Sequence, residues 1–427
     1  MNAPIPTPFA PPPVAPHGAP PGDVPLPAEA LAAVRRPIAE ATGLPNAAYT
    51  DEAVFALERD AVLGRHWTAL LFVDSLPGNH VRPIDFMGVP LYAQRTAEHG
   101  VRVFHNVCSH RGMRLVDEEK RLRGNGNIVC PYHCWTYAPD GELRKTPHIG
   151  GFGVHAIEGF DRSAHGLKEV RSHVWNRIVF VNLDGTAEPF EVAAAPVIER
   201  YRALAGETAE GELRAPPNDA GTRIELQCNW KLVLENYLEA YHLPFVHPAL
   251  SSYSPVNDHA SEFMSDACAG QITTDFETQG DPEHAFPRFS GWDPERTRTA
   301  EYPVLYPNLL LGFQIDHFFA IIVTPVSAGR AVQDLMIFYA GDEAATHERF
   351  DVGRARNLKA WHAVFEEDRE PCERMQQGRR SPGYAGGAFS PVLDACPHHF
   401  QRWMAERYAE TTAAGATTTG ATAVGTT

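Results

Sequence analysis

The sequence predicts an α+β protein in which a small all-β domain precedes a larger domain that combines helices with an antiparallel β-sheet. Short β-rich runs separated by Gly, Pro, Asn and Asp fill residues 67–183. Helical periodicity and apolar strands follow, without the regular strand–helix alternation that builds parallel sheets. With 427 residues, 44% hydrophobic and 21% charged, the chain has an ordinary globular composition and enough length for about two or three domains.

The globular body lies between two tails of biased composition. Residues 1–27 are dominated by Pro, Ala and Gly, and residues 411–427 by Thr, Ala and Gly. Such segments bury too little apolar surface to offset the entropy of ordering, so we expect both to be disordered. We divide the body into a helical segment at 28–66 that packs on the larger domain, the all-β domain at 67–183, and the larger domain at 184–410.

The formal net charge of −16, from 37 Lys and Arg against 53 Asp and Glu, argues against nucleic-acid and anionic-membrane partners, which require a basic surface. The Pro-rich beginning lacks the basic and apolar regions of a secretory signal. The apolar stretch 305–326 is interrupted by polar residues and is predicted to form two core strands rather than a membrane span. Seven cysteines in a long chain do not indicate a disulfide framework, so we expect reduced thiols and a cytoplasmic protein.

Regular elements outside the all-β domain are predicted in the following order. Thr50 caps a helix over residues 51–65, in which apolar residues recur at helical spacing. A second helix begins at Asn229, strands follow near 303–340, and a long helix covers residues 353–378.

The first chemical motif is NVCSHRG at 106–112 followed by CPYHCW at 130–135. Each half is compact enough for a tight loop to point one thiolate and one imidazole at a common centre. The four candidate ligands are Cys108, His110, Cys130 and His133. Two thiolates and two imidazoles suit either a tetrahedral zinc ion or a [2Fe–2S] cluster in which two histidines replace two cysteines on one iron. The spacing alone does not decide between them.

The second motif is NWKLVLENYLEAYHLPFVHP at 229–248. Its apolar residues form a helical stripe, and Glu239 and His242 lie on another face. Pro244 discourages continuation of the helix, which places His242 at the helix end and His247 in the loop beyond it. Two imidazoles arranged in this way can share one metal ion and leave one side of it open.

Asp368 is the candidate third ligand of this second metal ion. It falls in the middle of an apolar helical stripe within WHAVFEEDREPCERMQQG at 361–378, and a core-facing aspartate needs a cation or a metal as its partner. The alternative partner is a buried arginine. We expect Glu366, Glu367 and Glu373 to point elsewhere, into solvent. Two histidines and one carboxylate would form the facial triad of a non-haem iron centre.

Together these motifs resemble the Rieske non-haem iron oxygenases of the aromatic-ring-hydroxylating superfamily. CxHRG with CPYHxW is similar to their Rieske domain, and NWKxxxENYxExYHxxxxHP with EDxxxCExxQxG is similar to their catalytic domain, over residues 45–408. The resemblance implies a Rieske [2Fe–2S] domain and a helix-grip-like catalytic domain with an antiparallel sheet flanked by helices. It also implies a cluster held by Cys108 and Cys130 on one iron and by His110 and His133 on the other. Cys134 departs from the family pattern, in which a small residue is commoner, and we expect it to pack beside the cluster. The implied Fe(II) ligands are His242, His247 and Asp368.

The resemblance further implies a role for Glu239 and a set of partners. Glu239 would be the bridging acid, hydrogen-bonded between a histidine of the Fe(II) site and a Rieske histidine of a neighbouring subunit. The implied assembly is a head-to-tail homotrimer. A flavin/iron–sulfur reductase or a ferredoxin would deliver electrons from NAD(P)H, and O2 would be the co-substrate.

The substrate is the least determined part of the prediction. The ExYH setting of Glu239 is similar to the branch of choline, glycine betaine and carnitine oxygenases, which favours oxidative N-demethylation of a quaternary ammonium compound. The first alternative is hydroxylation or cis-dihydroxylation of an aromatic or aromatic-acid substrate, and the second is a non-catalytic Fe–S electron carrier or zinc-stabilised binding protein. Aromatic side chains after the histidine motif are candidates for the pocket or for the core: Tyr253, Phe263, Phe276, Phe286, Phe289, Trp292 and Phe313.

Overall fold

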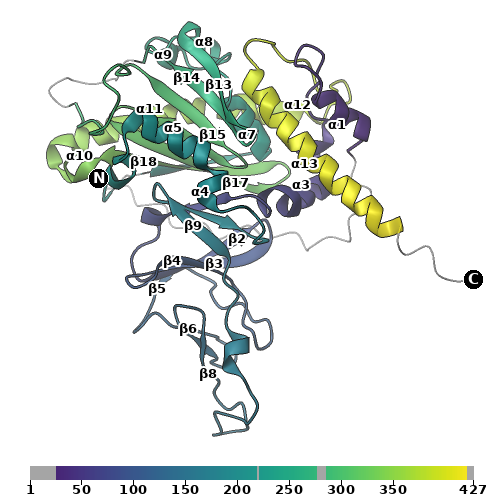
Figure 1. Cartoon of the computed structure of the whole chain (residues 1–427), viewed down its shortest axis with the longest axis vertical. Helices are drawn as coiled ribbons and strands as arrows, with labels where there is room; N and C mark the ends of the chain where they lie inside the picture. Colours follow the sequence, from purple (N-terminus) through teal and green to yellow (C-terminus); the bar gives the residue numbers. More distant parts are fainter. Residues whose placement is uncertain (1–25, 219–220, 277–284, 421–427) are drawn as a thin grey trace, which may run out of the picture. The chain divides into compact units, whose positions relative to one another are not determined.

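The computed structural model describes residues 26–218, 221–276 and 285–420, which form two compact units. The small unit contains residues 73–172, and the large unit contains residues 23–72 and 173–427. The predicted α+β class is confirmed, because the small unit is built of strands and the large unit combines helices with an antiparallel sheet (Figure 1). Within the described residues, no helix has the length and apolarity needed to cross a membrane.

The two predicted tails differ in how much of each the structure describes. All but the last two residues of the N-terminal tail, 1–27, lie outside the described residues. At the other end, helix α13 (Ala395–Gly420) continues beyond residue 411, where composition predicts a disordered tail. Residues 421–427 lie outside the described part of the chain.

The small unit contains two antiparallel sheets around one core. The first has the strand order β4-β3-β2-β5, and the second has the order β6-β7-β8. Their core is a cluster of buried aromatic and aliphatic side chains that includes Tyr92, Phe104, Trp135 and Tyr137. The bounds are β2 (His80–Phe86), β3 (Val89–Thr96), β4 (Gly100–His105), β5 (Lys120–Arg121), β6 (Ile128–Val129), β7 (Thr136–Tyr137) and β8 (Leu143–Lys145), with single turns at η2 (Val73–Ser75) and η3 (Arg162–His165).

The large unit is organised by an eight-stranded sheet in which every pairing is antiparallel. The path runs β11-β18-β17-β16-β15-β14-β13, and β12 also pairs with β18. The stretch 305–326, predicted as two strands, contains the end of β15, all of β16 and most of β17. The bounds are β11 (Leu213–Arg214), β12 (Gly221–Leu226), β13 (His259–Ser265), β14 (Cys268–Thr273), β15 (Ala300–Leu305), β16 (Leu309–Phe313), β17 (His317–Ser327) and β18 (Arg330–Ala340).

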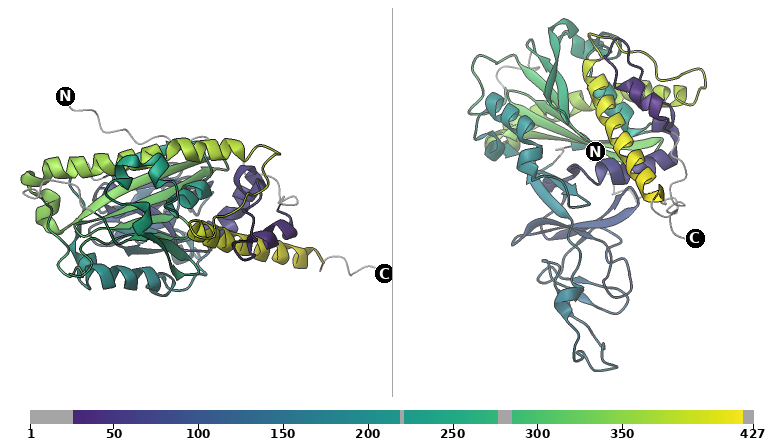
Figure 2. Two further views of the ribbon diagram at one scale, coloured as in Figure 1. Left: turned by 90° about the horizontal axis from the view of Figure 1, so that it is seen from above. Right: turned by 45° about the vertical axis from the view of Figure 1, so that its right-hand side comes forward.

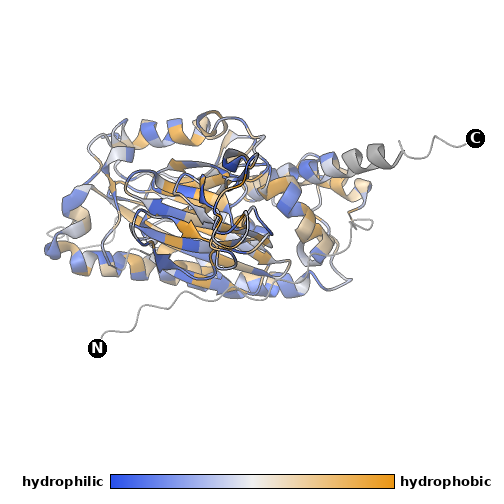
Figure 3. Cartoon of the chain, turned by 90° about the horizontal axis from the view of Figure 1, so that it is seen from below, coloured by the Kyte–Doolittle hydropathy of each residue, from blue (hydrophilic) through white to orange (hydrophobic). Residues whose placement is uncertain are grey.

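Helices cover both faces of this sheet. Successive residues of a strand point to opposite sides, so each face presents side chains against which a helix can pack. On β17, Phe318 contacts Tyr201 of α5 (Ala195–Ala205), with ring centroids 5.5 Å apart. The next residue, Phe319, contacts Trp361 of α11 (Asp351–Glu367) on the other side, at 4.3 Å. Figure 2 shows the sheet between these helices, and Figure 3 shows polar and apolar residues interspersed along both strands and helices.

The large unit contains further strands and helices besides the main sheet and its two covering helices. A second, three-stranded sheet has the order β1-β10-β9. The helix over 51–65 is capped by Asp51 rather than by the predicted Thr50, since the Asp51 carboxylate accepts from the N–H groups of Ala53 and Val54. The bounds are α1 (Ala28–Val34), α2 (Ala47–Thr50), α3 (Glu52–Glu58), η1 (Arg59–Leu63), β1 (Thr68–Phe72), β9 (Arg171–Trp175), β10 (Ile178–Asn182), α4 (Phe190–Ala193), α6 (Ala209–Glu212), α7 (Trp230–Tyr237), α8 (Leu243–Val246), α9 (Pro248–Ser251), η4 (Val256–Asp258), α10 (Gly341–Thr346), η6 (Glu348–Phe350) and α12 (Arg369–Gly378).

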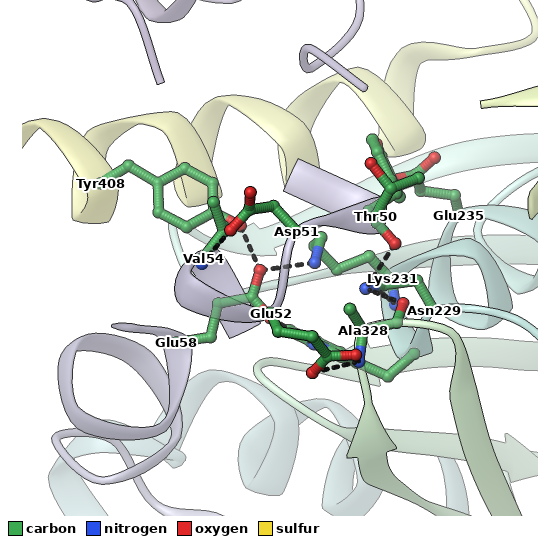
Figure 4. Close-up of polar contacts among 12 residues, drawn as sticks. Thr50, Asp51, Glu52, Val54, Glu58, Asn229, Lys231, Glu235, Ala328 and Tyr408 are labelled. Atoms are coloured by element: carbon green, nitrogen blue, oxygen red, sulfur yellow. Dashed lines mark hydrogen bonds and ion pairs between the residues drawn. The ribbon is translucent and has the colours of Figure 1, made fainter. Parts of the chain in front are cut away.

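A fully buried ionic cluster joins three of these helices and anchors the start of α7. Lys231 Nζ lies 2.5 Å from Glu58 Oε1, and neither side chain is exposed to solvent. Trp230 Nε1 donates to the other carboxylate oxygen at 2.7 Å. The hydroxyl of Tyr408 on α13 also donates to Glu58, and Figure 4 shows Tyr408 and Lys231 beside this carboxylate. A buried carboxylate with a cation and two further donors is well compensated for its desolvation. We call these four residues the Glu58 cluster.

Candidate metal centres

The two halves of the first motif form loops of the same backbone geometry. In one loop the N–H of Cys108 donates to Met113 O and the N–H of Gly112 donates to Cys108 O. In the other, the N–H of Cys130 donates to Trp135 O at 2.8 Å, and the N–H of Cys134 donates to Cys130 O at 3.0 Å. Each loop therefore turns back on its cysteine and presents the histidine that follows.

Cys134 occupies the position of a glycine in this repeated geometry. Gly112 has φ +72° in the first loop, and Cys134 has φ +56° in the second. The left-handed region disfavours any residue with a Cβ, because Cβ approaches the following carbonyl oxygen. The side chain of Cys134 is exposed, as is that of His110, and its packing beside the cluster stays a prediction.

The donor set of the first motif fits a two-iron cluster. Cys108 and Cys130 are both buried, and the rings of His110 and His133 lie 4.8 Å apart. Nδ1 of His133 is buried and has no hydrogen-bond partner in the described part of the chain, as expected of an atom that binds a metal. The four side chains do not form a group whose donor atoms converge on one ion, which a tetrahedral zinc site requires. The geometry thus favours the cluster over zinc.

The second motif begins on a helix that ends earlier than predicted. Asn229 caps α7 as expected, with its side chain accepting from the N–H of Lys231. The helix stops at Tyr237, so His242 does not lie at its end. His242 and His247 instead flank the single turn of α8, in which Pro244 occupies the first turn, where proline is tolerated.

Asp368 and the two histidines converge on one point. Their donor atoms all lie within 4.8 Å of one another, the one such group found in the described residues. Asp368 Oδ1 is 2.9 Å from His247 Nε2 and 3.5 Å from His242 Nε2, and it accepts from Asn236 Nδ2 at 3.2 Å. Asp368 is buried between α11 and α12, and the arginine partner considered as an alternative is absent from its described contacts.

Each histidine is held at its second ring nitrogen by a carboxylate. His242 Nδ1 lies 2.6 Å from Glu239 Oε1, and His247 Nδ1 lies 2.7 Å from Glu367 Oε2. Such carboxylates orient metal-binding imidazoles and keep the proton on the nitrogen that faces away from the metal. The expectation that Glu367 points away from the site is therefore wrong. That expectation came from helical periodicity, which gives the direction of a side chain and not its length. A glutamate side chain is long enough to reach a group that faces the neighbouring helix position.

The charges around His247 suit a cation. Burial lowers the pKa of this imidazole, but Asp368 and Glu367 outweigh burial and raise the pKa above its ordinary value. The surroundings therefore stabilise positive charge beside Asp368. Among the described residues, no further protein donor converges on the point shared by the two imidazoles and the carboxylate. Such a donor set is the facial triad preferred by non-haem Fe(II), and it leaves positions for other ligands.

A cavity beside these three residues is lined mainly by apolar and aromatic groups. Four aromatic rings belong to its wall: Tyr237, Tyr302, Trp361 and Phe365. The polar residues of the wall are Asn236, Glu239, His242, His247, Ser254, His259, Gln271 and Asp368, and the aliphatic ones are Ala240, Leu243, Leu250 and Val364. None of the seven aromatic residues named from the sequence as pocket candidates lines this cavity. Phe289, Trp292 and Phe313, for example, are buried in the core on the α5 face of the sheet.

Sequence reasoning missed these wall residues because they come from separate elements. Tyr237 ends α7, Tyr302 lies on β15, and Trp361 and Phe365 lie on α11. The signal that was available is the stripe of α11, where Trp361 and Phe365 precede Asp368 at helical spacing. No local pattern marks Tyr302 or His259.

Family models match both parts of the chain. Residues 66–158 match the Rieske [2Fe-2S] domain, and residues 214–410 match the catalytic domain of the ring hydroxylating alpha subunit. The first match contains Cys108 to His133, and the second contains His242, His247 and Asp368.

Relatives and solved structures agree with these matches. The chain is 26% identical over 380 residues to the chloroplastic choline monooxygenase of Arabidopsis thaliana, covering 85% of this chain and 82% of that protein. It is 28% identical over 404 residues to the glycine betaine monooxygenase oxygenase subunit of Chromohalobacter salexigens, covering 85% of each chain. Its fold matches that of the quaternary ammonium Rieske monooxygenase CntA with a TM-score of 0.71 at 22% identity, over 90% of this chain and 98% of the other.

Fold, donor sets and family matches lead to one identification, which also supplies the cofactors. Enzymes of this kind carry a Rieske [2Fe–2S] cluster and a mononuclear non-haem iron, incorporate oxygen from O2, and receive electrons from a reductase or a ferredoxin. The chain belongs to the Rieske non-haem iron oxygenases and is the oxygenase (α) subunit of such a system.

Proposed function

We propose that this oxygenase hydroxylates an N-methyl group of a small methylated ammonium compound and thereby demethylates it. The observation that carries the proposal is the aromatic wall of the cavity beside His242, His247 and Asp368. The rings of such a wall attract a quaternary ammonium group through cation–π interaction. The choline and glycine betaine monooxygenases similar to this chain support the same substrate class.

The four rings form a continuous surface. Tyr302 contacts Trp361 at 6.3 Å, Trp361 contacts Phe365 at 5.9 Å, Phe365 contacts Tyr237 at 6.3 Å, and Tyr237 contacts Tyr302 at 6.4 Å between ring centroids. Because every ring touches two others, the wall behaves as one aromatic patch rather than as isolated side chains.

The polar atoms of this wall are bonded elsewhere. The Tyr237 hydroxyl donates to Leu311 O at 2.7 Å, and the Tyr302 hydroxyl accepts from Gln314 Nε2 at 3.1 Å. Trp361 Nε1 donates to His317 Nε2 at 3.0 Å. The polar groups of these three side chains are therefore each bonded to a residue outside the cavity wall, and the rings face the cavity.

The proposed reaction consumes O2, two electrons and two protons for each methyl group. A C–H bond of the methyl becomes C–OH and the second oxygen atom leaves as water. The resulting N-hydroxymethyl group then breaks its C–N bond, releasing formaldehyde, a proton and the demethylated amine. Bound iron supplies O2 activation, and the Rieske cluster supplies stored single electrons.

Each proposed ligand has a place in this scheme. We assign Cys108, His110, Cys130 and His133 to the cluster and His242, His247 and Asp368 to Fe(II). Glu239 and Glu367 orient the two imidazoles through their Nδ1 atoms.

We further propose that Glu239 connects the iron site with a Rieske histidine of a neighbouring subunit in a head-to-tail homotrimer. The contact between Glu239 Oε1 and His242 Nδ1 supports the part of this connection that lies within one subunit. Inter-subunit electron transfer has been described for a quaternary ammonium Rieske monooxygenase whose fold this chain shares. We also propose a cytoplasmic location, because the seven cysteines of the chain are all free thiols, as is usual in a reducing compartment.

Substrate-dependent O2 uptake with a surrogate reductase and NAD(P)H tests the reaction. We expect uptake and formaldehyde release with choline or tetramethylammonium, in equal amounts. Coupled uptake with aromatic compounds alone, giving hydroxylated or cis-diol products, would contradict the ammonium proposal in favour of the aromatic alternative.

The role of Glu239 is tested by Glu239→Gln, which keeps the size of the side chain and removes its charge. We expect acid-labile sulfide to stay at the wild-type level and Fe(II) to be retained when it is supplied in excess, while coupled turnover is lost. The control is Glu199→Gln, on the exposed side of α5. Undiminished turnover of Glu239→Gln would refute the connection.

A further inference from the structure

We infer that the substrate is a cation that carries no carboxylate or other anionic group. The inference rests on the proposed function and narrows it, because methylated ammonium compounds include both simple cations, such as choline, and zwitterions, such as glycine betaine. The charges of the cavity wall separate these two classes.

The charged side chains of the wall other than histidine are both acidic. They are Glu239 and Asp368, and no lysine or arginine belongs to the wall. Every lysine and arginine of the protein lies in the described ranges, since the segments outside them contain neither residue in their sequence. The cavity can therefore offer a carboxylate no ammonium or guanidinium partner from its own chain.

His259 is the wall residue that could otherwise supply positive charge, and its surroundings keep it neutral. The Ser254 hydroxyl and His259 Nε2 form a 2.9 Å hydrogen bond, and the imidazole lies parallel to the ring of Tyr302. Nδ1 of the same imidazole is buried and has no hydrogen-bond partner among the described residues, so an imidazolium, which donates from both nitrogens, would leave a buried N–H without an acceptor. Burial lowers the pKa of His259 to about 4, which agrees with a neutral ring near pH 7.

The metal site does not provide a substitute partner during N-demethylation. A carboxylate held at the iron would place the anionic end of the substrate at the reacting position and move the N-methyl groups away from it. With a methyl group at the reacting position, the carboxylate of a zwitterion lies against another part of the wall, which contains no lysine or arginine. A carboxylate moved from water into such surroundings loses hydration without gaining a counter-charge.

Equilibrium binding to the holoenzyme without reductant tests the inference directly. The probes are tetramethylammonium, choline and glycine betaine, measured by calorimetry with the quenching of tryptophan fluorescence as a second readout. We expect both cations to bind at least about tenfold more tightly than glycine betaine, since an unpaired carboxylate is costly to desolvate. Glycine betaine binding as tightly as choline would overturn the inference.

Two variants with a matched control locate the effect in the cavity. Trp361→Leu should weaken choline binding about tenfold, whereas Trp292→Leu, which removes an equally buried indole from the core on the α5 face, should leave it unchanged. Val364→Lys introduces a basic side chain into the wall and should shift the preference toward glycine betaine. Equal effects of the two tryptophan variants would contradict the aromatic wall as the cation site.

The outcomes separate this inference from the proposed function. Demethylation of glycine betaine with no binding of choline would refute the inference and leave ammonium demethylation standing. Failure of all three probes to bind, together with coupled oxidation of an aromatic compound, would refute the proposed function itself.

Discussion

Glu367 gives the most specific test of the proposed iron site, because its carboxylate contacts the proposed ligand His247 and is not itself one of the three candidate ligands. Its Oε2 lies 2.7 Å from His247 Nδ1, and His247 Nε2 faces Asp368. The His247 ring is almost fully buried, at 2% exposure of its side chain, whereas the side chain of Glu367 is 44% exposed. The imidazole therefore has little alternative support from solvent, and loss of the carboxylate is felt at Nε2.

The expected magnitude follows from what each substitution removes. Loss of a carboxylate behind a metal-bound histidine lowers metal affinity by about 10- to 100-fold, or about 1.4 to 2.8 kcal/mol. Glu367→Gln keeps an oxygen that accepts from Nδ1 and removes only the charge, so we expect about tenfold weaker Fe(II) binding. Glu367→Ala removes the acceptor as well, so its effect should approach 100-fold.

Anaerobic competition between the protein and a chromophoric chelator measures this affinity with Fe(II) or Co(II). Acid-labile sulfide should stay constant, since the cluster motif lies in the other unit. The control is Glu366→Gln, which alters the neighbouring glutamate that pairs with Arg369 at 2.7 Å. Metal affinity that is unchanged in Glu367→Ala, or lowered equally in Glu366→Gln, would refute the reasoning.

Three further predictions concern stability. Lys231→Met leaves the buried Glu58 carboxylate without its cation and should lower the free energy of unfolding by about 3–5 kcal/mol, and adding Glu58→Gln should restore part of it, as a denaturant double-mutant cycle will show. Cys134→Gly relieves the positive φ and should raise the denaturation midpoint of the cluster absorbance, corresponding to about 1 kcal/mol, whereas Cys134→Ala should change little. His259 has a folded-state pKa of about 4, below its unfolded value, so its contribution to stability is present at pH 7 and is lost as pH falls. By pH 5 the loss should be about 2 kcal/mol, and His259→Asn should remove this part of the pH dependence in urea titrations.

The metal-binding candidates could be predicted because each motif is short. Cys108 and His110 are two residues apart, and Cys130 and His133 are three apart, so a single tight loop brings each pair together. The same holds for the histidines that flank the one turn of α8. Asp368 was recognised from the cost of an unpaired carboxylate in an apolar stripe, and the structure places its oxygen beside both histidines.

The remaining features depend on contacts that sequence patterns do not encode. The early end of α7 lets the chain turn between Tyr237 and His242, and the apolar stripe of the motif gives no sign of that stop. Glu367 was predicted to point into solvent because helical periodicity gives the direction of a side chain but not how far the side chain extends. The aromatic wall combines Tyr302 of a strand with residues of two helices, which become neighbours only when the helices cover the sheet.

The net charge takes on a more specific meaning once it is divided between the units. The small unit contains 13 Lys and Arg against 11 Asp and Glu, a net charge of 13 − 11 = +2, so the large unit carries −16 − 2 = −18. The acidic character thus belongs to the unit with the substrate cavity, whose field attracts cations and repels anions in the direction required for a substrate without a carboxylate. The unit that accepts electrons is close to neutral, so its partner protein need not be basic. Screening limits both effects to about 8–10 Å at ordinary ionic strength, and substrate selection then depends on the cavity wall itself.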